Sequence, residues 1–416
     1  METMFVIYAA YSEKRLKVVH RHGPCSPLGH RKQLDHERVL RQDRHRVQSL
    51  HRRRASALSK LGSSLATATV PGRSGLALGS GDYIVNVGFG TPKQDKSVIF
   101  DTGSDLAWIQ CRQCHSCYPQ NEPLFDPSKS STFSRVGCDS DYCSSDSTFC
   151  AASTCNYEVH YGDGSYSDGD LVQDTLTLTP SNELKDFAFG CGVDSAGFFG
   201  EVAGLIGLGR GRLSLVSQSS QVYGGAFSYC IPPFASSTGY LTLGPGKQSP
   251  NTQFTSLLSN SDMSYYFVEL IGLSVGGKGL QIPPGSFANP GTIIDSGTVL
   301  TYLPSDAYLA LRSEFRRRMS KYPLAPPVHP LDTCYDLTGY NRVMVPEVAL
   351  LFSGGVTLNV DASGILLVMD ISQACLAFVA NQDSSISIIG NMQQKTYDVV
   401  YDVPNGKLGF AAGGCG

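Results

Sequence analysis

One short motif occurs twice in the sequence, and this internal repeat constrains the fold more than any other feature. The segments SVIFDTGS (97–104) and TIIDSGT (292–298) each carry an apolar run into an Asp, a hydroxyl residue and a Gly. Each is followed, at a similar distance, by an apolar pair and a Gly, in GLIG (204–207) and SIIG (387–390). Repeats this long predict two homologous lobes rather than a solenoid, with one Asp from each lobe.

The composition predicts a mostly β protein. Of the 416 residues 41% are hydrophobic, and 44 Gly and 22 Pro separate short alternating runs such as DYIVNVGFG (82–90). A chain of this length can bury two or three cores. We therefore expect a mostly β chain with two homologous lobes. The expected domains are an N-terminal basic segment at 1–73, an N-terminal lobe at 74–245 and a C-terminal lobe at 246–416.

The first 73 residues differ in charge from the rest of the chain. They carry 15 Lys and Arg against 5 Asp and Glu, whereas residues 74–416 carry 18 against 31. Val39, Leu40 and Val47 belong to a loose amphipathic helical pattern in this basic segment. We predict a detachable prosegment that opposite charge holds on the acidic body. A nucleic-acid-binding arm is the weaker alternative, because the segment lacks interleaved aromatic residues, and we expect no nucleic-acid partner.

Thirteen cysteines are too many for an ordinary cytosolic protein of this size. Twelve of them follow the basic segment, an even number that suits six disulfides and an oxidising compartment. A metal or redox site in CRQCHSC (111–117) is the alternative. A ferredoxin-like run would need a further Cys at position 121, which is Asn121. Disulfides are therefore the preferred interpretation, and we expect no bound metal.

The N-terminus and the apolar runs bear on localisation. MFVIYAAY (4–11) is short for a signal-peptide core and is flanked by acidic residues, so the signal is predicted to be short or truncated. No apolar run reaches the ~18 residues of a membrane span. We expect entry into the secretory pathway and no membrane association.

Two carboxylates brought together across the pseudo-twofold axis would share a proton, because like charges about 3 Å apart cannot both ionise. Asp101 and Asp295 would then serve as base and acid on either side of a water, which is chemistry suited to peptide hydrolysis without a cofactor. Small donors must hold such a pair without adding charge. The predicted supporting residues are Thr102, Gly103, Ser104, Ser296, Gly297 and Thr298.

Residues 80–416 resemble a pepsin-family (A1) aspartic protease of the plant nepenthesin-like or chloroplast-nucleoid-protease-like branch. FDTGSDLAW, IIDSGT, the two apolar-Gly elements and YDVPNGKLGFA carry the resemblance. It implies a bilobal pepsin-like fold, with two pseudo-twofold-related β-barrel-like lobes and an active-site cleft between them. It also implies a zymogen that hydrolyses peptide bonds at acid pH, with Asp101 and Asp295 as the catalytic dyad. It also implies a substrate-binding flap at Tyr161, Gly162, Asp163 and Gly164, with Trp108 supporting the tyrosine hydroxyl. Ser296 departs from the commoner Thr but keeps the hydroxyl, so we expect activity.

The resemblance also suggests a disulfide pairing and a rival function. The implied pairs are Cys111–Cys114, Cys117–Cys191, Cys138–Cys155, Cys143–Cys150, Cys230–Cys415 and Cys334–Cys375. Some pepsin-like plant proteins are catalytically inactive binders, such as xylanase inhibitors, although both motifs are intact here. Protein or peptide substrates and a monomeric state are expected, and apoplast, vacuole and plastid all stay open as the final compartment.

Overall fold

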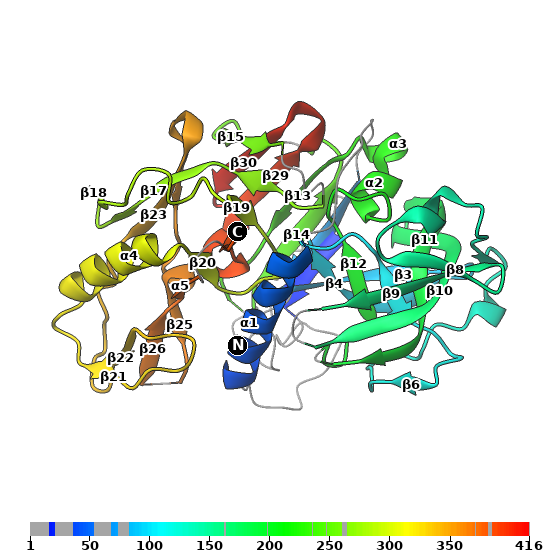
Figure 1. Cartoon of the computed structure of the whole chain (residues 1–416), viewed down its shortest axis with the longest axis horizontal. Coiled ribbons are helices and arrows are strands. Elements are labelled where there is room, and N and C mark those ends of the chain that lie inside the picture. The colour runs from blue at the N-terminus through cyan, green and yellow to red at the C-terminus, as the bar shows by residue number, and fades with distance from the viewer. Residues whose placement is uncertain are drawn as a thin grey trace, which may run out of the picture.

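The computed structural model describes residues 16–20, 36–53, 68–73, 83–161, 164–197, 199–234, 236–246, 248–259, 264–370, 372–381 and 385–415. The signal-like stretch, Cys25, Gly162 and Asp163 lie outside these ranges. The described chain forms two lobes rich in β-strands with helix α1 (His36–Arg53) between them (Figure 1). The predicted mostly β, bilobal architecture is therefore confirmed.

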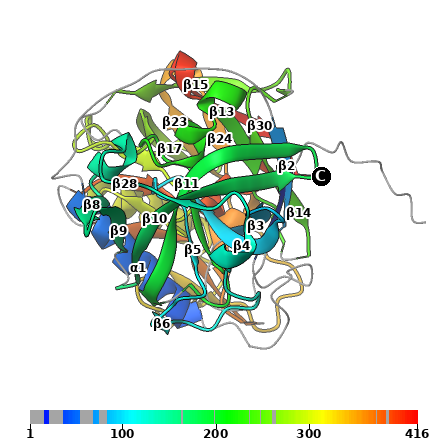
Figure 2. The same ribbon diagram turned by 90° about the vertical axis from the view of Figure 1, so that its right-hand side faces the viewer.

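The N-terminal lobe is built from strands that bring the first motif to its inner edge. Strand β4 pairs with β3 on one side and in parallel with β12 on the other, and the long hairpin β10–β11 covers them (Figure 2). The elements are β3 (Tyr83–Phe89), β4 (Gln94–Asp101), β5 (Trp108–Gln110), β6 (Ser116–Cys117), η1 (Pro127–Lys129), β7 (Ser134–Arg135), η2 (Asp141–Ser144), β8 (Thr148–Ala151), β9 (Thr154–His160), β10 (Tyr166–Thr179), β11 (Asn182–Ala196), β12 (Gly204–Gly207), α2 (Leu215–Gln218) and α3 (Ser220–Tyr223).

The C-terminal lobe repeats the arrangement around the second motif. Strand β19 pairs in parallel with β28, which also contacts β20, and helix α4 buries its apolar face against the lobe. The elements are β15 (Gln253–Leu258), β16 (Phe267–Val268), β17 (Leu270–Val275), β18 (Lys278–Gly279), β19 (Thr292–Ile294), β20 (Thr301–Leu303), α4 (Ser305–Arg318), β21 (Leu324–Ala325), β22 (Cys334–Asp336), β23 (Val348–Phe352), η3 (Ser353–Gly355), β24 (Thr357–Asn359), α5 (Ala362–Ile365), β25 (Leu366–Val368), β26 (Gln373–Leu376), β27 (Phe378–Ala380), β28 (Ser387–Ile389) and η4 (Asn391–Gln394).

A central sheet joins the two lobes beneath the motifs. Strand β13 pairs with β29, and β29 pairs with β30, while β1 from the basic segment pairs with β14 and β3. The bounds are β1 (Leu16–His20), β2 (Ala68–Arg73), β13 (Ala226–Cys230), β14 (Thr238–Leu243), β29 (Tyr397–Asp402), η5 (Val403–Asn405) and β30 (Lys407–Ala412). Because strands from both halves form one sheet, the two motifs are held on a common base.

Helix α1 confirms the amphipathic helix expected in the basic segment. Its apolar residues Val39, Leu40, Val47 and Leu50 are buried in a cluster whose other members come from the C-terminal lobe. Burial of such a face, rather than helix propensity alone, holds a helix in place in water. In the part of the chain that the structure describes, no helix is long and apolar enough to cross a membrane.

Candidate active site

The two motif aspartates stand at the inner ends of equivalent strands. Asp101 ends β4 and lies opposite Gly207 of β12. Asp295 directly follows β19, where its N–H donates to the carbonyl of Ile389 over 3.0 Å. The apolar-Gly elements seen in the sequence are therefore the strands that flank each Asp, which explains why the repeat has two parts.

The residues after each Asp lock the two loops together across the axis. The Thr102 N–H donates to Ser296 Oγ over 3.1 Å, and the Ser296 N–H donates to Thr102 Oγ1 over 2.8 Å. Each hydroxyl thus serves the opposite lobe. These two reciprocal hydrogen bonds fix the separation of Asp101 and Asp295. The Ser296 hydroxyl accepts its bond as a Thr hydroxyl would.

Each carboxylate receives a matching set of hydrogen bonds. Ser104 donates to Asp101 and Thr298 donates to Asp295, both over 2.5 Å. The N–H of the Gly two positions after each Asp adds a second donor, at 2.9 Å for Asp101 and 3.0 Å for Asp295. These neutral donors hold the carboxylates in place without adding positive charge.

Gly103 and Gly297 are required because each lies very close to the carboxylate of the opposite lobe. A Cβ on Gly103 would lie 2.8 Å from Asp295 Oδ1, and one on Gly297 would lie 2.4 Å from Asp101 Oδ1. Both separations are below van der Waals contact. Any side chain here would push the two carboxylates apart.

Arg46 of helix α1 is a site residue that sequence reasoning missed. Its Nη2 lies 2.5 Å from Asp101 Oδ1 and 2.9 Å from Asp295 Oδ2, so one nitrogen contacts both carboxylates. Its Nε donates to Thr298 Oγ1 over 3.2 Å. The opposite charges of residues 1–73 and 74–416 indicated that the basic segment is attracted to the rest of the chain. No local sequence signal, however, distinguishes Arg46 from the other arginines of the segment.

The two aspartates differ in their titration. Burial raises the pKa of both, but the charge and hydrogen bonds of Arg46 leave the pKa of Asp101 below its usual range. The pKa of Asp295 stays raised, because burial and the charge of Asp101 outweigh the influence of Arg46. With Arg46 docked, Asp101 is thus the more readily ionised member and Asp295 the more readily protonated one.

Two further α1 side chains contact the C-terminal lobe. The buried Asp43 carboxylate accepts the N–H groups of Val299 and Leu300, at 2.5 and 3.1 Å, and burial raises its pKa to about 7 against these lowering contacts. His51 Nε2 donates to the carbonyl of Ile386 over 2.9 Å, and burial lowers the pKa of this imidazole.

Tyr161 and Trp108 lie together beside the first motif. The Trp108 Nε1–H donates to the Tyr161 hydroxyl over 2.8 Å, and Phe199 packs edge-on against both rings. Gly164, with a φ of +84°, donates its N–H back to the Tyr161 carbonyl. The geometry matches the support expected for a flap tyrosine, while Gly162 and Asp163 lie outside the described residues.

Six disulfides join the twelve cysteines, but four of the six implied pairs are wrong. The structure joins Cys111–Cys191, Cys114–Cys117, Cys138–Cys150, Cys143–Cys155, Cys230–Cys415 and Cys334–Cys375. Only the last two were predicted.

Strand pairing and burial explain the corrected bridges. Strand β5 runs parallel to β11 with Ile109 opposite Cys191, so Cys111, two residues on, reaches Cys191 and leaves Cys114 to close a short turn with Cys117. Cys155 is fully buried in the cluster against which Cys143 packs, and these two therefore bond.

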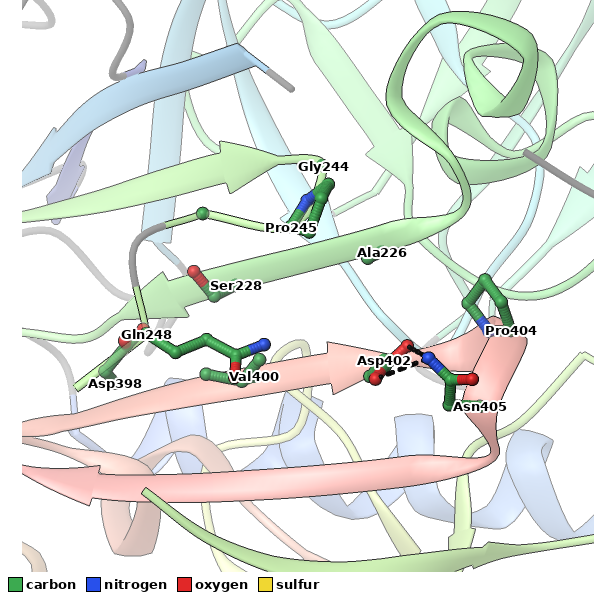
Figure 3. A pocket seen from close by; sticks show the side chains of 11 residues that line it. Ala226, Ser228, Gly244, Pro245, Gln248, Asp398, Val400, Asp402, Pro404 and Asn405 are labelled. Atoms are coloured by element: carbon green, nitrogen blue, oxygen red, sulfur yellow. Dashed lines mark hydrogen bonds between the residues drawn. The ribbon is translucent and has the colours of Figure 1, made fainter. Parts of the chain in front are cut away.

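A separate pocket lies on the central sheet rather than at the dyad (Figure 3). It has a volume of about 140 Å³ and is lined by β13, β29 and the loop after β14. Its Asp402 carboxylate already accepts two hydrogen bonds of 2.9 Å from Asn405. No predicted site residue lines it, and no group of three metal-ligating side chains occurs among the described residues.

Comparison with known proteins agrees with this geometry. The family models described as xylanase inhibitor N-terminal and C-terminal match residues 83–245 and 265–412. The chain is 47% identical to aspartyl protease AED1 of Arabidopsis thaliana, over 98% of this chain and 88% of that protein. It is 40% identical to the aspartic proteinase nepenthesin-2 of Nepenthes gracilis, over 81% of this chain and 79% of that protein.

A solved structure shares the fold at much lower identity. The crystal structure of edgp superposes with a TM-score of 0.67 at 19% identity, covering 80% of this chain and 92% of that one. The chain belongs to the family of plant pepsin-like (A1) aspartic proteases.

Proposed function

We propose that this protein is an aspartic endopeptidase that is made as an inactive precursor and cleaves proteins or peptides at acid pH. The observation that carries the proposal is the pair of buried carboxylates, Asp101 and Asp295, held by matching donors and close enough for one Arg46 nitrogen to contact both. The ionised member of the pair would take a proton from the attacking water, and the protonated member would donate one to the scissile carbonyl oxygen.

The precursor state is supported by what α1 does to the dyad. The water and the scissile bond would have to occupy the place where the Arg46 guanidinium lies. The contact depends on ionised carboxylates, so it weakens as pH falls toward their pKa values. Cleavage at 63–81, a stretch that includes strand β2, would then let α1 leave the dyad, although β1 also has to separate from β14 and β3 before the whole segment is released.

We also propose that the protein enters the secretory pathway and acts as a monomer. Six disulfides fit an oxidising compartment such as the secretory pathway, and a monomer is sufficient because one chain supplies both aspartates.

The test is digestion of a denatured protein by the full-length chain after incubation between pH 3 and 7, with and without pepstatin. We expect cleavage at acid pH only, and Asp101→Asn and Asp295→Asn should each lower the rate by about 10³-fold or more, because a lone carboxylate cannot be both acid and base. Asp146→Asn, at an exposed position in the cysteine-rich stretch, is the matched control. If either dyad variant keeps most of its activity, the assignment is wrong.

A second candidate function is binding without catalysis. It is favoured only by the descriptions of the matching family models, which name xylanase inhibitors. Stable capture of a xylanase by a protein that hydrolyses nothing at any pH would support this candidate instead.

A further inference from the structure

Close to the dyad, three side chains with no exposed surface form a chain of hydrogen bonds. They are Tyr229 of β13, Tyr401 of β29 and Gln394 of η4. The Tyr229 hydroxyl contacts Gln394 Oε1 and lies 3.0 Å from the Tyr401 hydroxyl. Polar groups buried this deeply are costly unless they are hydrogen-bonded. Three separate elements thus bring polar groups together at one place in the apolar core.

Gln394 connects this chain to the backbone of Asp295. Its Nε2 donates to the carbonyls of Asp295 and Ile389 over 3.1 and 2.9 Å. The Asp295 N–H donates to the same Ile389 carbonyl. The amide of Gln394 therefore bridges the ends of β19 and β28, and it holds the piece of backbone that carries the Asp295 carboxylate.

The contacts of Gln394 fix the direction of the hydrogen bonds along the chain. An amide atom that contacts two carbonyl oxygens must be the nitrogen, so the other atom is the oxygen and can only accept. Tyr229 therefore donates to Gln394, and the Tyr229 oxygen accepts the hydrogen of Tyr401. The Tyr401 oxygen is left as an acceptor.

The Thr102 hydroxyl supplies the donor for Tyr401. Burial and then Tyr229 raise the pKa of Tyr401, whereas a hydrogen bond with the Thr102 side chain lowers it, as a donor to the tyrosine oxygen does. Thr102 Oγ1 also lies 3.5 Å from Asp295 Oδ1, which is longer than a normal O–H···O bond. Because a hydroxyl has one hydrogen, the hydrogen that Thr102 gives to Tyr401 is withheld from Asp295.

We infer that Tyr401, Tyr229 and Gln394 are positioning residues of the dyad, which hold the backbone of Asp295 and turn the Thr102 hydrogen away from its carboxylate. The inference rests on the proposed endopeptidase function and adds a buried support to its active site. A neutral donor stabilises an ionised carboxylate. By withholding one such donor, this 229–394–401 chain helps the two aspartates to retain the proton that they share.

The groups that face Asp295 come from several elements. Asp101 of β4 and Arg46 of α1 carry charge, whereas burial raises the pKa values of Tyr229 and Tyr401 and keeps both neutral at acid pH. Arg46 leaves with the prosegment. In the active protein, the pKa of Asp295 then depends on burial, on Asp101 and on its hydrogen bonds, so one more donor should lower this pKa.

The test is Tyr401→Phe, which keeps the ring that stacks on Phe227 and packs edge-on against Tyr266. With acid-activated full-length protein and a peptide substrate, we expect kcat to fall about tenfold at unchanged KM, because a displacement of 1 Å can cost about 100-fold. The freed Thr102 hydrogen should also move one limb of the pH profile of kcat/KM to lower pH. A profile with both limbs in place would overturn the inference, even if kcat falls.

Tyr397→Phe is the matched control on the same strand. The Tyr397 hydroxyl donates to the Asn359 carbonyl over 2.8 Å and has no contact with the 229–394–401 chain. This variant loses a buried hydrogen bond of the same kind, so it controls for general loss of stability. It should keep the kcat and the pH profile of the parent. An equal shift in Tyr397→Phe would mean that any loosening of β29 has this effect, and the inference would be wrong.

Two further variants test whether the side chains act as a unit. Tyr229→Phe and Gln394→Met should each move the same limb to lower pH, and the double variant should lower kcat no more than the more severe single variant. Effects on kcat that multiply would refute a connected chain. If the parent cleaves peptides but no variant moves the limb, only this inference fails. If the parent cleaves no peptide at any pH, the endopeptidase proposal fails, and the positioning role falls with it.

Discussion

Asp101 and Asp295 receive equivalent support from their own lobes, with a hydroxyl three positions on and a glycine N–H two positions on. Helix α1, in contrast, approaches the two lobes unequally. Its buried apolar residues pack with the C-terminal lobe, and Arg46 also contacts Thr298 on that side. The lobes thus build a nearly symmetric pair of carboxylates, and the bound segment makes the precursor asymmetric.

The contacts within the lobes and the contacts of α1 therefore have different roles. The symmetric contacts fix the distance between the carboxylates. The asymmetric contacts attach α1 to the C-terminal lobe, and the Arg46 contact with both carboxylates adds to that attachment.

The largest effect should come from removing the shared contact. Arg46→Ala leaves two buried carboxylates without their ion-pair partner, and loss of one partner of a buried ion pair typically costs about 3–5 kcal/mol. We expect α1 to detach at neutral pH and the linker at 63–81 to become sensitive to added protease. Limited proteolysis followed by mass spectrometry measures this.

Arg41→Ala is the matched control for that experiment, because Arg41 is exposed on the same helix. It should leave the precursor as resistant as the parent. Equal sensitivity of both variants would mean that overall positive charge, rather than the Arg46 contact, holds the segment.

Substitutions of the two supporting hydroxyls should have a smaller effect, and they test whether the two carboxylates are equivalent. Ser104→Ala and Thr298→Ala each remove a hydroxyl that lowers the pKa of its own Asp. Each should therefore raise that pKa, because the ionised carboxylate loses one charge-assisted hydrogen bond.

The two variants should change opposite limbs of the pH–rate profile. If Asp101 must be ionised, Ser104→Ala moves the acid limb of kcat/KM to higher pH. If Asp295 must be protonated, Thr298→Ala moves the alkaline limb to higher pH. A shift of the same limb in both variants would show that the base and acid are not divided between the lobes in this way.

The smallest effect concerns the pH at which α1 leaves. Burial raises the pKa of Asp43 to about 7, so the docked helix takes up a proton here, and docking by this group strengthens as pH falls from about 7 to 4. His51 acts in the other direction: its pKa is lowered by burial, so docking weakens as pH falls through the ordinary His value of about 6.5.

Asp43→Asn removes the group that opposes acid release. We expect the midpoint of release to move to higher pH by a few tenths of a unit or more, measured by the mass of the protein after incubation across pH 3 to 7. His51→Gln should move it to lower pH. Midpoints that do not differ would show that the dyad and Arg46 alone set the release pH.

The sequence by itself determined the features that depend on neighbouring residues. An apolar strand that runs into Asp, hydroxyl and Gly specifies the local shape of each motif, so the pattern of residues alone identified Asp101, Asp295 and their supporting residues. The spacing of Val39, Leu40 and Val47 likewise predicted helix α1, because helical periodicity is a local property. The parity of the cysteines predicted six disulfides.

Only the tertiary structure decided which distant groups meet. The pairing of Cys111 with Cys191 depends on the parallel register of β5 and β11, which no spacing along the chain encodes. Arg46 is one of several arginines in its segment, and it reaches Asp295, 249 residues away, only because α1 docks in one register. The acceptor role of Asp43 depends on the same docking. Contacts of this kind follow from the packing of whole faces, and packing is settled only when the lobes and the helix come together.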